Sequence, residues 1–233
     1  MALIREMNRN ERPREKAKRY GVKSLSAAEL LAILMRSGVK GTNALELAES
    51  LLQASGDLCG VAKMNFAEMK KIRGISDVKA LELLACFELS RRIAYETAVE
   101  KNVIRDPESL LEWLYREIGS SQQERFLAVY LNTANHIIDY QELFVGTINE
   151  AGVYPREVFK QALLLNSTNL MLVHNHPSGN LRPSRNDINL TREFVQIGRL
   201  MNIRILDHLI VSNSDFFSFA ANGLLNDMES NEK

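Results

Sequence analysis

The spacing of apolar residues predicts two kinds of structure, helices in residues 1–100 and alternating strands and helices beyond them. In the first part, three polar residues precede a glutamate by three positions, which is the capping-box spacing at a helix start. These pairs are Ser26 with Glu29, Asn43 with Glu46, and Asn65 with Glu68. Gly38, Gly56 and Gly74 end the segments before them. We expect an all-helical domain with several short helices and one long helix through Arg92.

Beyond residue 106 the pattern changes to short apolar runs separated by helical spacing. The runs typical of buried strands span residues 126–131, 137–145, 170–174 and 203–211, and the helical segments span 107–118, 155–165 and 184–201. Such alternation predicts an α/β or α+β domain with a mostly buried sheet. The apolar pattern lapses at 101–106, so we expect a linker there, the sheet domain at 107–225, and a frayed tail at 226–233.

Composition bounds the class of protein. With 233 residues and 45% hydrophobic content, the chain can form one large domain or two modest ones. Cys59 and Cys86 match neither a CxxC pair nor a disulfide framework, which favours a reducing compartment. No apolar run approaches the ~18 residues of a membrane span, and the N-terminus lacks the apolar core of a signal peptide. We therefore expect a cytoplasmic protein with no membrane partner.

The formal net charge of zero conceals an asymmetry between the two parts. Residues 1–100 hold 17 Lys and Arg against 13 Asp and Glu, whereas residues 101–233 hold 12 against 16. Much of the basic excess lies near the start of the chain, at Arg5, Arg9, Arg12, Arg14, Lys16, Lys18 and Arg19. Two interpretations stay open, an arm that binds phosphates and a solvated basic tail.

A predicted turn in residues 1–100 is a second candidate for nucleic-acid binding. The segment from Ile72 to Ala80 resembles a helix-hairpin-helix, in which a glycine turn offers backbone N–H groups to a DNA phosphate. Ser76 stands where that motif has its second glycine. The same segment would also serve as a packing corner of a helical bundle. DNA binding through residues 1–100 is therefore one of two expectations.

The candidate chemistry is concentrated where the apolar run at 170–174 ends. His174 and His176 lie two residues apart at the C-terminal end of this predicted strand, so they point the same way and can share one ion. Pro177 and Pro183 exclude regular structure after the strand and predict a stiff loop.

Asp187 completes the candidate site. Helical spacing begins at Ser184, which places Asp187 in the first turn, where the helix dipole favours a carboxylate. Two imidazoles and one carboxylate are three ligands for zinc, which then keeps a fourth position for water, as catalytic rather than structural sites do. In the alternative interpretation, Ser184 and Asp187 only form a capping box, and the histidines are solvated loop residues.

These residues have the pattern of a known family. His174, His176, Pro177, Ser184 and Asp187 match the motif of the JAMM (MPN-plus) metallopeptidases without a gap. More specifically, the chain resembles the bacterial RadC proteins, which share the JAMM fold and carry a DNA-repair label. The segments that carry this resemblance are Arg12–Lys16, Leu25–Leu34, Phe144–Thr147, Tyr154–Glu157, His174–Gly179, Pro183–Ser184 and Asp207–Val211. It covers nearly the whole chain.

The resemblance implies a zinc hydrolase that cleaves amide or isopeptide bonds in a protein or peptide. In the family mechanism an upstream glutamate carries the proton, and Glu124, just ahead of a predicted strand, is the best match. Three other glutamates compete for this role: Glu142, Glu150 and Glu157. Ser184 would bond the attacked carbonyl oxygen as charge develops. Asn175 stands where many JAMM peptidases carry Ser or Thr, which fits the RadC branch.

Two other hypotheses compete with amide hydrolysis. One is a DNA-associated factor whose metal site cuts or senses nucleic acid, and the other is a scaffold in which the metal only fixes a loop. Nucleases usually hold Mg²⁺ with oxygen ligands, so two histidines and one aspartate favour amide chemistry. His208, beside Asp207 in an apolar run, is expected to be a satisfied core histidine rather than a partner of the metal site.

Overall fold

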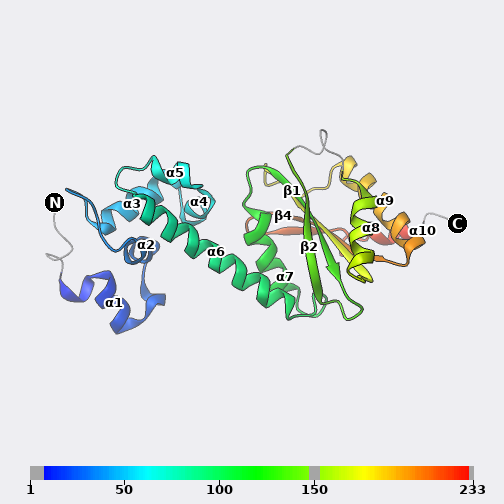
Figure 1. Ribbon diagram of the computed structural model, residues 1–233, viewed down its shortest axis with the longest axis horizontal. Coiled ribbons are helices and arrows are strands. Elements are labelled where there is room, and N and C mark those ends of the chain that lie inside the picture. The colour runs from blue at the N-terminus through cyan, green and yellow to red at the C-terminus, as the bar shows by residue number, and fades with distance from the viewer. Residues whose placement is uncertain (1–7, 147–152, 231–233) are drawn as a thin grey trace. The chain divides into compact units, whose positions relative to one another are not determined.

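The computed structural model describes residues 8–146 and 153–230, and the chain divides into two compact units, Met1–Ser90 and Arg91–Lys233 (Figure 1). The described part of the first unit is all-helical, and the second is a mixed α+β domain, as the apolar spacing predicted. Each unit has its own buried core.

The described helices of the first unit are η2 Arg9–Glu11, α1 Pro13–Tyr20, η3 Val22–Ser24, α2 Ala27–Met35, α3 Ala44–Ser55, α4 Leu58–Lys63, α5 Phe66–Lys70 and α6 Asp77–Val99, which continues into the second unit. All three predicted capping boxes are formed, with Ser26, Asn43 and Asn65 as the caps. Each box satisfies amide groups that a helix start leaves without partners, so local sequence explains where α2, α3 and α5 begin.

Part of the basic N-terminal segment is helix α1, and some of its charges have partners. Nζ of Lys16 lies 2.9 Å from a carboxylate oxygen of Glu29 in α2, and Lys18 pairs with Glu15 within α1 at 3.4 Å. Residues 13–20 are therefore helical, and phosphate binding by this segment stays a prediction. Arg5 lies outside the described residues.

The border between the units lies inside α6, ahead of the expected linker at 101–106. The last turns of α6 carry Ala94 and Ala98 into a core of the second unit. The N–H of Val103 then donates to the carbonyl of Asn135 at 3.0 Å. Residues 101–106 are thus bound to the second unit, a contact between distant parts of the chain that local pattern does not reveal.

The second unit is one five-stranded sheet with helices on both faces. Its elements are α7 Pro107–Leu114, the π-helical turn η4 Tyr115–Gly119, β1 Glu124–Leu131, β2 Ile137–Gly146, α8 Pro155–Leu164, β3 Asn169–Asn175, α9 Arg185–Met201, β4 Arg204–Val211, β5 Phe216–Ser218 and α10 Leu224–Ser230. The strand order is β2-β1-β3-β4-β5, and only β3 and β4 are parallel. The four predicted strands are confirmed, whereas β5 is too short to show a period.

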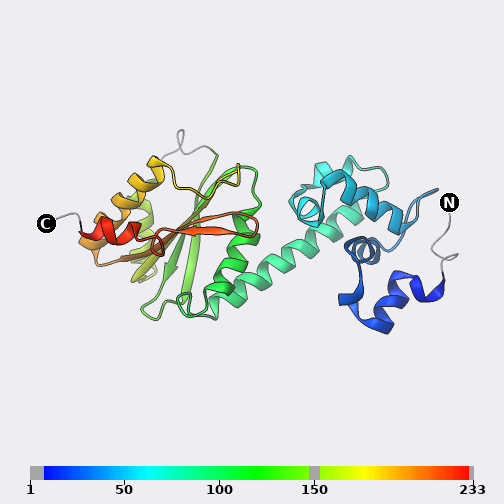
Figure 2. The same cartoon turned by 180° about the vertical axis from the view of Figure 1, so that it is seen from behind.

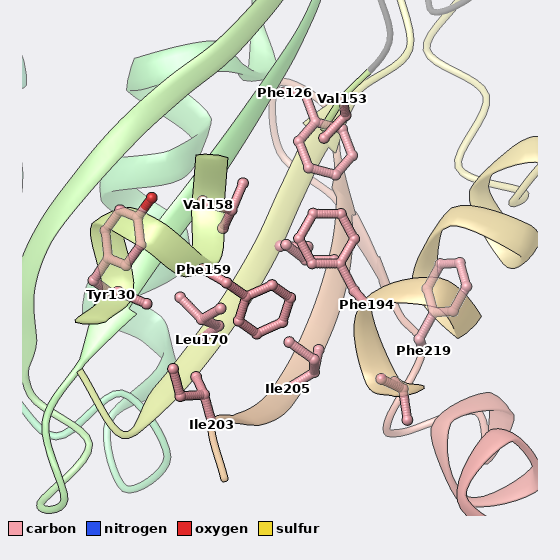
Figure 3. Close-up of a cluster of buried hydrophobic side chains, with 14 of the residues drawn as sticks. Phe126, Tyr130, Val153, Val158, Phe159, Leu170, Phe194, Ile203, Ile205 and Phe219 are labelled. Atoms are coloured by element: carbon pink, nitrogen blue, oxygen red, sulfur yellow. The ribbon is translucent and has the colours of Figure 1, made fainter. Parts of the chain in front are cut away.

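Strand alternation sorts the apolar side chains onto the two faces of this sheet. Phe126 and Tyr130 of β1 face α8 and α9, where Figure 3 shows them beside Phe159 and Phe194. Leu127, the neighbour of Phe126, belongs to the core that includes α7 and the end of α6. The face under α8 and α9 is the one that carries the candidate site.

The predicted tail is largely a helix. Leu225 and Met228 of α10 are buried in the same core as the phenylalanines of α8 and α9. In Figure 2 this helix, drawn in red, lies beside α9, which it contacts. Two apolar side chains in a polar segment are too few to reveal helical periodicity in the sequence. Their burial against the rest of the domain nevertheless stabilises helix α10.

Both cysteines are free thiols, as the sequence predicted. Cys59 is exposed and Cys86 is half-buried. Among the helices of residues 8–146 and 153–230, none is both long enough and apolar enough to cross a membrane.

Candidate metal centre

His174 and His176 lie at the end of β3, on the face that α9 covers. Side chains alternate along β3, so Leu170 and Leu172 join the core under α8 and α9 and His174 follows them to the same side. His174 is fully buried, and its ring stacks on Phe126 with 5.6 Å between ring centroids. His176 is half-buried just beyond the strand. The strand thus presents both imidazoles to one point.

The first turn of α9 supplies a carboxylate to this point. The N-cap Ser184 accepts the N–H of Asp187 through Oγ at 3.2 Å and donates its own N–H to Oδ2 of Asp187 at 2.6 Å. This is the predicted capping box. It orients the buried carboxylate, so its capping and ligand roles are compatible.

The donor atoms of three candidate ligand residues converge with spacings that suit zinc. Nε2 of His174 is 3.1 Å from Nε2 of His176 and 3.4 Å from Oδ1 of Asp187, while Nε2 of His176 is 3.5 Å from Oδ2. Tetrahedral bonds of about 2.0–2.1 Å separate ligand atoms by roughly 3.3–3.4 Å. A carboxylate oxygen of Glu124 joins the cluster, and all four ligand atoms lie within 4.8 Å of one another.

The donor atoms are also arranged in a way that suits a cation between them. Nδ1 of His176 lies 2.5 Å from the carbonyl oxygen of Asn180, and because a carbonyl only accepts, the ring proton is on Nδ1 and Nε2 keeps a lone pair. Among the described residues, Oδ1 of Asp187 is buried without a hydrogen-bond partner. Burial of a carboxylate oxygen without a hydrogen-bond partner is costly, and a metal ion shared with the imidazole nitrogens would offset that cost.

The local electrostatics favour the protonation states that a metal needs. Burial lowers the pKa of His174, so its imidazole is held neutral. Burial raises the pKa of Asp187, but the adjacent His174 and His176 lower it by more than burial raises it. The pKa of Asp187 is therefore below its usual value, and the group is a carboxylate. Asp187 in turn raises the pKa of His176, so a proton competes with a metal ion there at acidic pH.

Of the three candidate proton carriers that the structure describes, one lies in the cluster. Glu124, the first residue of β1, lies in the cluster with the histidines. Glu142 pairs instead with Arg125, and Glu157 pairs with Arg156. Glu150 lies outside the described residues. The roles of Glu124 as proton carrier and of Ser184 as oxyanion donor stay predictions.

His208 is a buried core histidine with both ring nitrogens hydrogen-bonded, as expected, and it also contacts the candidate site. Its Nε2 lies 2.8 Å from Nδ1 of His174, a proposed ligand. Complete burial lowers its pKa well below the usual value, which keeps the ring neutral. The sequence signal was the polar pair Asp207-His208 in an apolar strand, but only the parallel pairing of β3 with β4 brings it beside His174.

The predicted phosphate-binding turn has mixed features. Gly74 has a φ of 100°, which suits the tight turn between α5 and α6. Asp77, the first residue of α6, places a carboxylate at this helix start and pairs with Lys70 at 2.6 Å. A carboxylate there competes with a phosphate for the same positive end of the helix dipole, so DNA binding by this turn stays a prediction.

A mixed sheet flanked by helices, with a His-His-Asp cluster at the end of a central strand, defines a domain of the JAB/MPN type that could hold a metal ion. The model of the RadC-like JAB domain matches residues 104–224, and the model of the UPF0758 N-terminal region matches residues 4–81. The chain belongs to the RadC (UPF0758) family.

Relatives match over almost the whole length. A UPF0758 protein of Shouchella clausii is 43% identical over 221 residues, which cover 95% of this chain and 96% of the relative. A UPF0758 protein of Bacillus pumilus is 39% identical over 223 residues, covering 96% and 100%. One from Roseiflexus castenholzii is 39% identical over 221 residues, covering 95% of each chain. These names state no activity, so functional inference depends on the site.

Proposed function

We propose that this protein is a zinc-dependent hydrolase that cleaves an amide or isopeptide bond in a protein or peptide. The observation that carries the proposal is the position of Glu124, whose carboxylate shares one cluster with the His174, His176 and Asp187 donor atoms. A purely structural zinc site is usually closed by four Cys or His ligands. Three ligands beside a half-buried glutamate suit a site that admits substrate and water.

Each side chain has a distinct task in this reaction. When bound, zinc acidifies water and polarises a carbonyl group. Glu124 accepts the proton of the attacking water and passes it to the leaving amine. The Oγ of Ser184 accepts the N–H of Asp187, and its hydroxyl hydrogen can therefore be donated to the oxygen of the substrate carbonyl.

The two competing functions have less support from the site. Hydrolysis of nucleic acid usually uses Mg²⁺ with octahedral oxygen ligands, whereas two of the three proposed ligands here are imidazole nitrogens. A scaffold needs no proton carrier, whereas hydrolysis gives the Glu124 carboxylate in this cluster a chemical role. We further propose a cytoplasmic location, which the two free cysteines favour, and a DNA-linked role, which the excess basic charge of residues 1–100 favours.

Metal analysis tests the site. The purified protein should hold about one zinc per chain, and His174→Ala and Asp187→Ala should each lose it. Glu124→Gln should retain zinc. If both ligand variants retain zinc at the parent level, the assignment of the ligands is wrong.

Trapping tests the reaction. Proteins that copurify with Glu124→Gln should be cut by the parent protein, and turnover by Glu124→Gln should be lower by roughly 10² to 10⁴. Glu157→Gln is the matched control, because Glu157 is exposed on α8 and outside the cluster. Cleavage by His174→Ala at the parent rate would contradict hydrolysis at this site, and no cleavage of any trapped protein by the parent would favour the scaffold.

A further inference from the structure

A chain of buried hydrogen bonds runs from α9 through β4 to the end of β3. Oγ1 of Thr191 lies 2.5 Å from the carbonyl oxygen of Asp187 and 2.6 Å from Nδ1 of His208. On the other side of the ring, Nε2 of His208 lies 2.8 Å from Nδ1 of His174. All four residues are at most 1% exposed. The chain begins and ends on proposed metal ligands.

The direction of every hydrogen bond in this chain follows from its first member. The carbonyl of Asp187 cannot donate, so the single hydroxyl hydrogen of Thr191 points to it. Thr191 must then accept from Nδ1–H of His208, which leaves Nε2 of the neutral His208 as an acceptor. His174 therefore donates through Nδ1–H, and the lone pair of its Nε2 faces the cluster.

We infer that His208 and Thr191 are positioning residues that set the tautomer of His174 and tie it to Asp187. The two ligands come from different elements, β3 and α9, and the described structure links their positions through β4. This inference rests on the proposed metal binding and is independent of whether the site hydrolyses anything. Residues that hold the outer nitrogen of a metal-binding histidine typically contribute about 10- to 100-fold to metal affinity.

The surroundings of His208 keep this chain of bonds in one arrangement. The His208 ring stacks on Phe219 with 4.7 Å between centroids, and its edge meets Phe126 at 5.4 Å. These apolar neighbours offer no alternative hydrogen-bond partner, so a tautomer change would leave buried groups unpaired.

Zinc affinity, measured by competition with a chelator, tests the inference. Thr191→Val keeps the side-chain shape but removes the hydroxyl, and it should bind zinc about 10- to 100-fold more weakly than the parent. His208→Phe should weaken zinc binding similarly. Thr191→Ser is the matched control, because it keeps the hydroxyl and should keep near-parent affinity. Far-UV circular dichroism and thermal melting check that each variant is folded.

A second measurement reports the tautomer directly. Nitrogen-15 NMR of the zinc-loaded parent should show the His208 proton on Nδ1 and the His174 proton on Nδ1. Equal zinc affinity of Thr191→Val and the parent, or a His208 proton on Nε2, would overturn the inference while leaving hydrolysis intact. If the parent binds no zinc at all, both the proposed function and this inference fail. The two experiments therefore distinguish failure of the inference alone from failure of the proposed function.

Discussion

The side-chain amide of Asn175 holds the backbone on both sides of Glu124. Its Oδ1 accepts the N–H of Arg125 at 2.8 Å, and its Nδ2 donates to the carbonyl oxygens of Gln123 and Ser121, both at 3.2 Å. Asn175 is almost fully buried, and its side-chain oxygen and both N–H groups of its side-chain amide have hydrogen-bond partners. The residue between the two histidine ligands thereby fixes the strand start that carries the proposed proton carrier.

Replacing Asn175 should therefore slow turnover without removing zinc. Asn175→Ala leaves the Arg125 N–H and two carbonyls without this partner, and Asn175→Ser is too short to reach all three. We expect a loss of about tenfold to 10² in turnover, the effect of displacing a reacting group by up to 1 Å. Steady-state kinetics on a trapped substrate and metal analysis measure the two properties separately.

The control is a double-mutant cycle with Glu124→Gln. Once the proton carrier is gone, its position no longer matters, so Asn175→Ala should add little further loss of turnover in that background. Full additivity of the two losses would show that Asn175 acts on something other than Glu124.

Ser184 has a structural and a proposed chemical role, and two substitutions separate them. Ser184→Ala should cost about 1 kcal/mol of unfolding free energy through the lost cap, and about 3–4 kcal/mol of transition-state stabilisation through the lost hydroxyl. Ser184→Gly should cost only a few tenths of a kcal/mol of stability, because glycine is tolerated at an N-cap, yet lose the same activity. Parent-level turnover by a well-folded Ser184→Gly would exclude the oxyanion role.

DNA binding by the first unit should depend on exposed basic residues around the turn before α6. The parent is expected to bind duplex DNA with an affinity that falls as salt rises. The double variant Lys71→Glu, Arg73→Glu should bind more weakly, since both residues are exposed beside Gly74. Fluorescence anisotropy at several salt concentrations measures this.

The control for this double variant is a matched pair of charge reversals in the second unit. Lys160→Glu with Arg204→Glu changes the net charge by the same amount at exposed positions. Equal weakening by both double variants would reflect overall charge, and no binding by the parent at low salt would contradict a DNA-binding role.

Lys79 should make the stability of the first unit depend on pH at the alkaline side. Its Nζ is buried and donates to the carbonyl oxygens of Gly74 at 3.2 Å and Gly38 at 3.4 Å, and burial lowers its pKa. Between that lowered pKa and the usual value near 10.5, the unfolded chain binds more protons than the folded one, so stability rises with pH. Urea unfolding at a series of pH values should show this rise in the parent.

Lys79→Met removes the buried amine, and the rise should disappear. Lys71→Met changes an exposed lysine of the same unit and should leave the pH dependence as it is in the parent. A rise that persists in Lys79→Met would assign it to another group.

Local sequence was sufficient for much of the fold and for three proposed ligands. Capping boxes such as Ser26 with Glu29 involve residues three apart, and strand periods such as that of β1 involve neighbours, so both can be predicted without the tertiary structure. The proposed ligands His174 and Asp187 flank one short loop, which is why their association was visible in the sequence.

Only the tertiary structure decided which distant residues meet this site. The sequence favoured Glu124 without excluding Glu142, and it did not predict the contacts of Asn175 and Thr191 or the hydrogen bond between His208 and His174. The contacts of Asn175 and His208 depend on the register of β1, β3 and β4, in which a shift of one residue would turn either side chain to the opposite face. The contact of Thr191 depends on how α9 packs against β4. The packing of both faces sets that register, and packing is a property of the whole domain rather than of any segment.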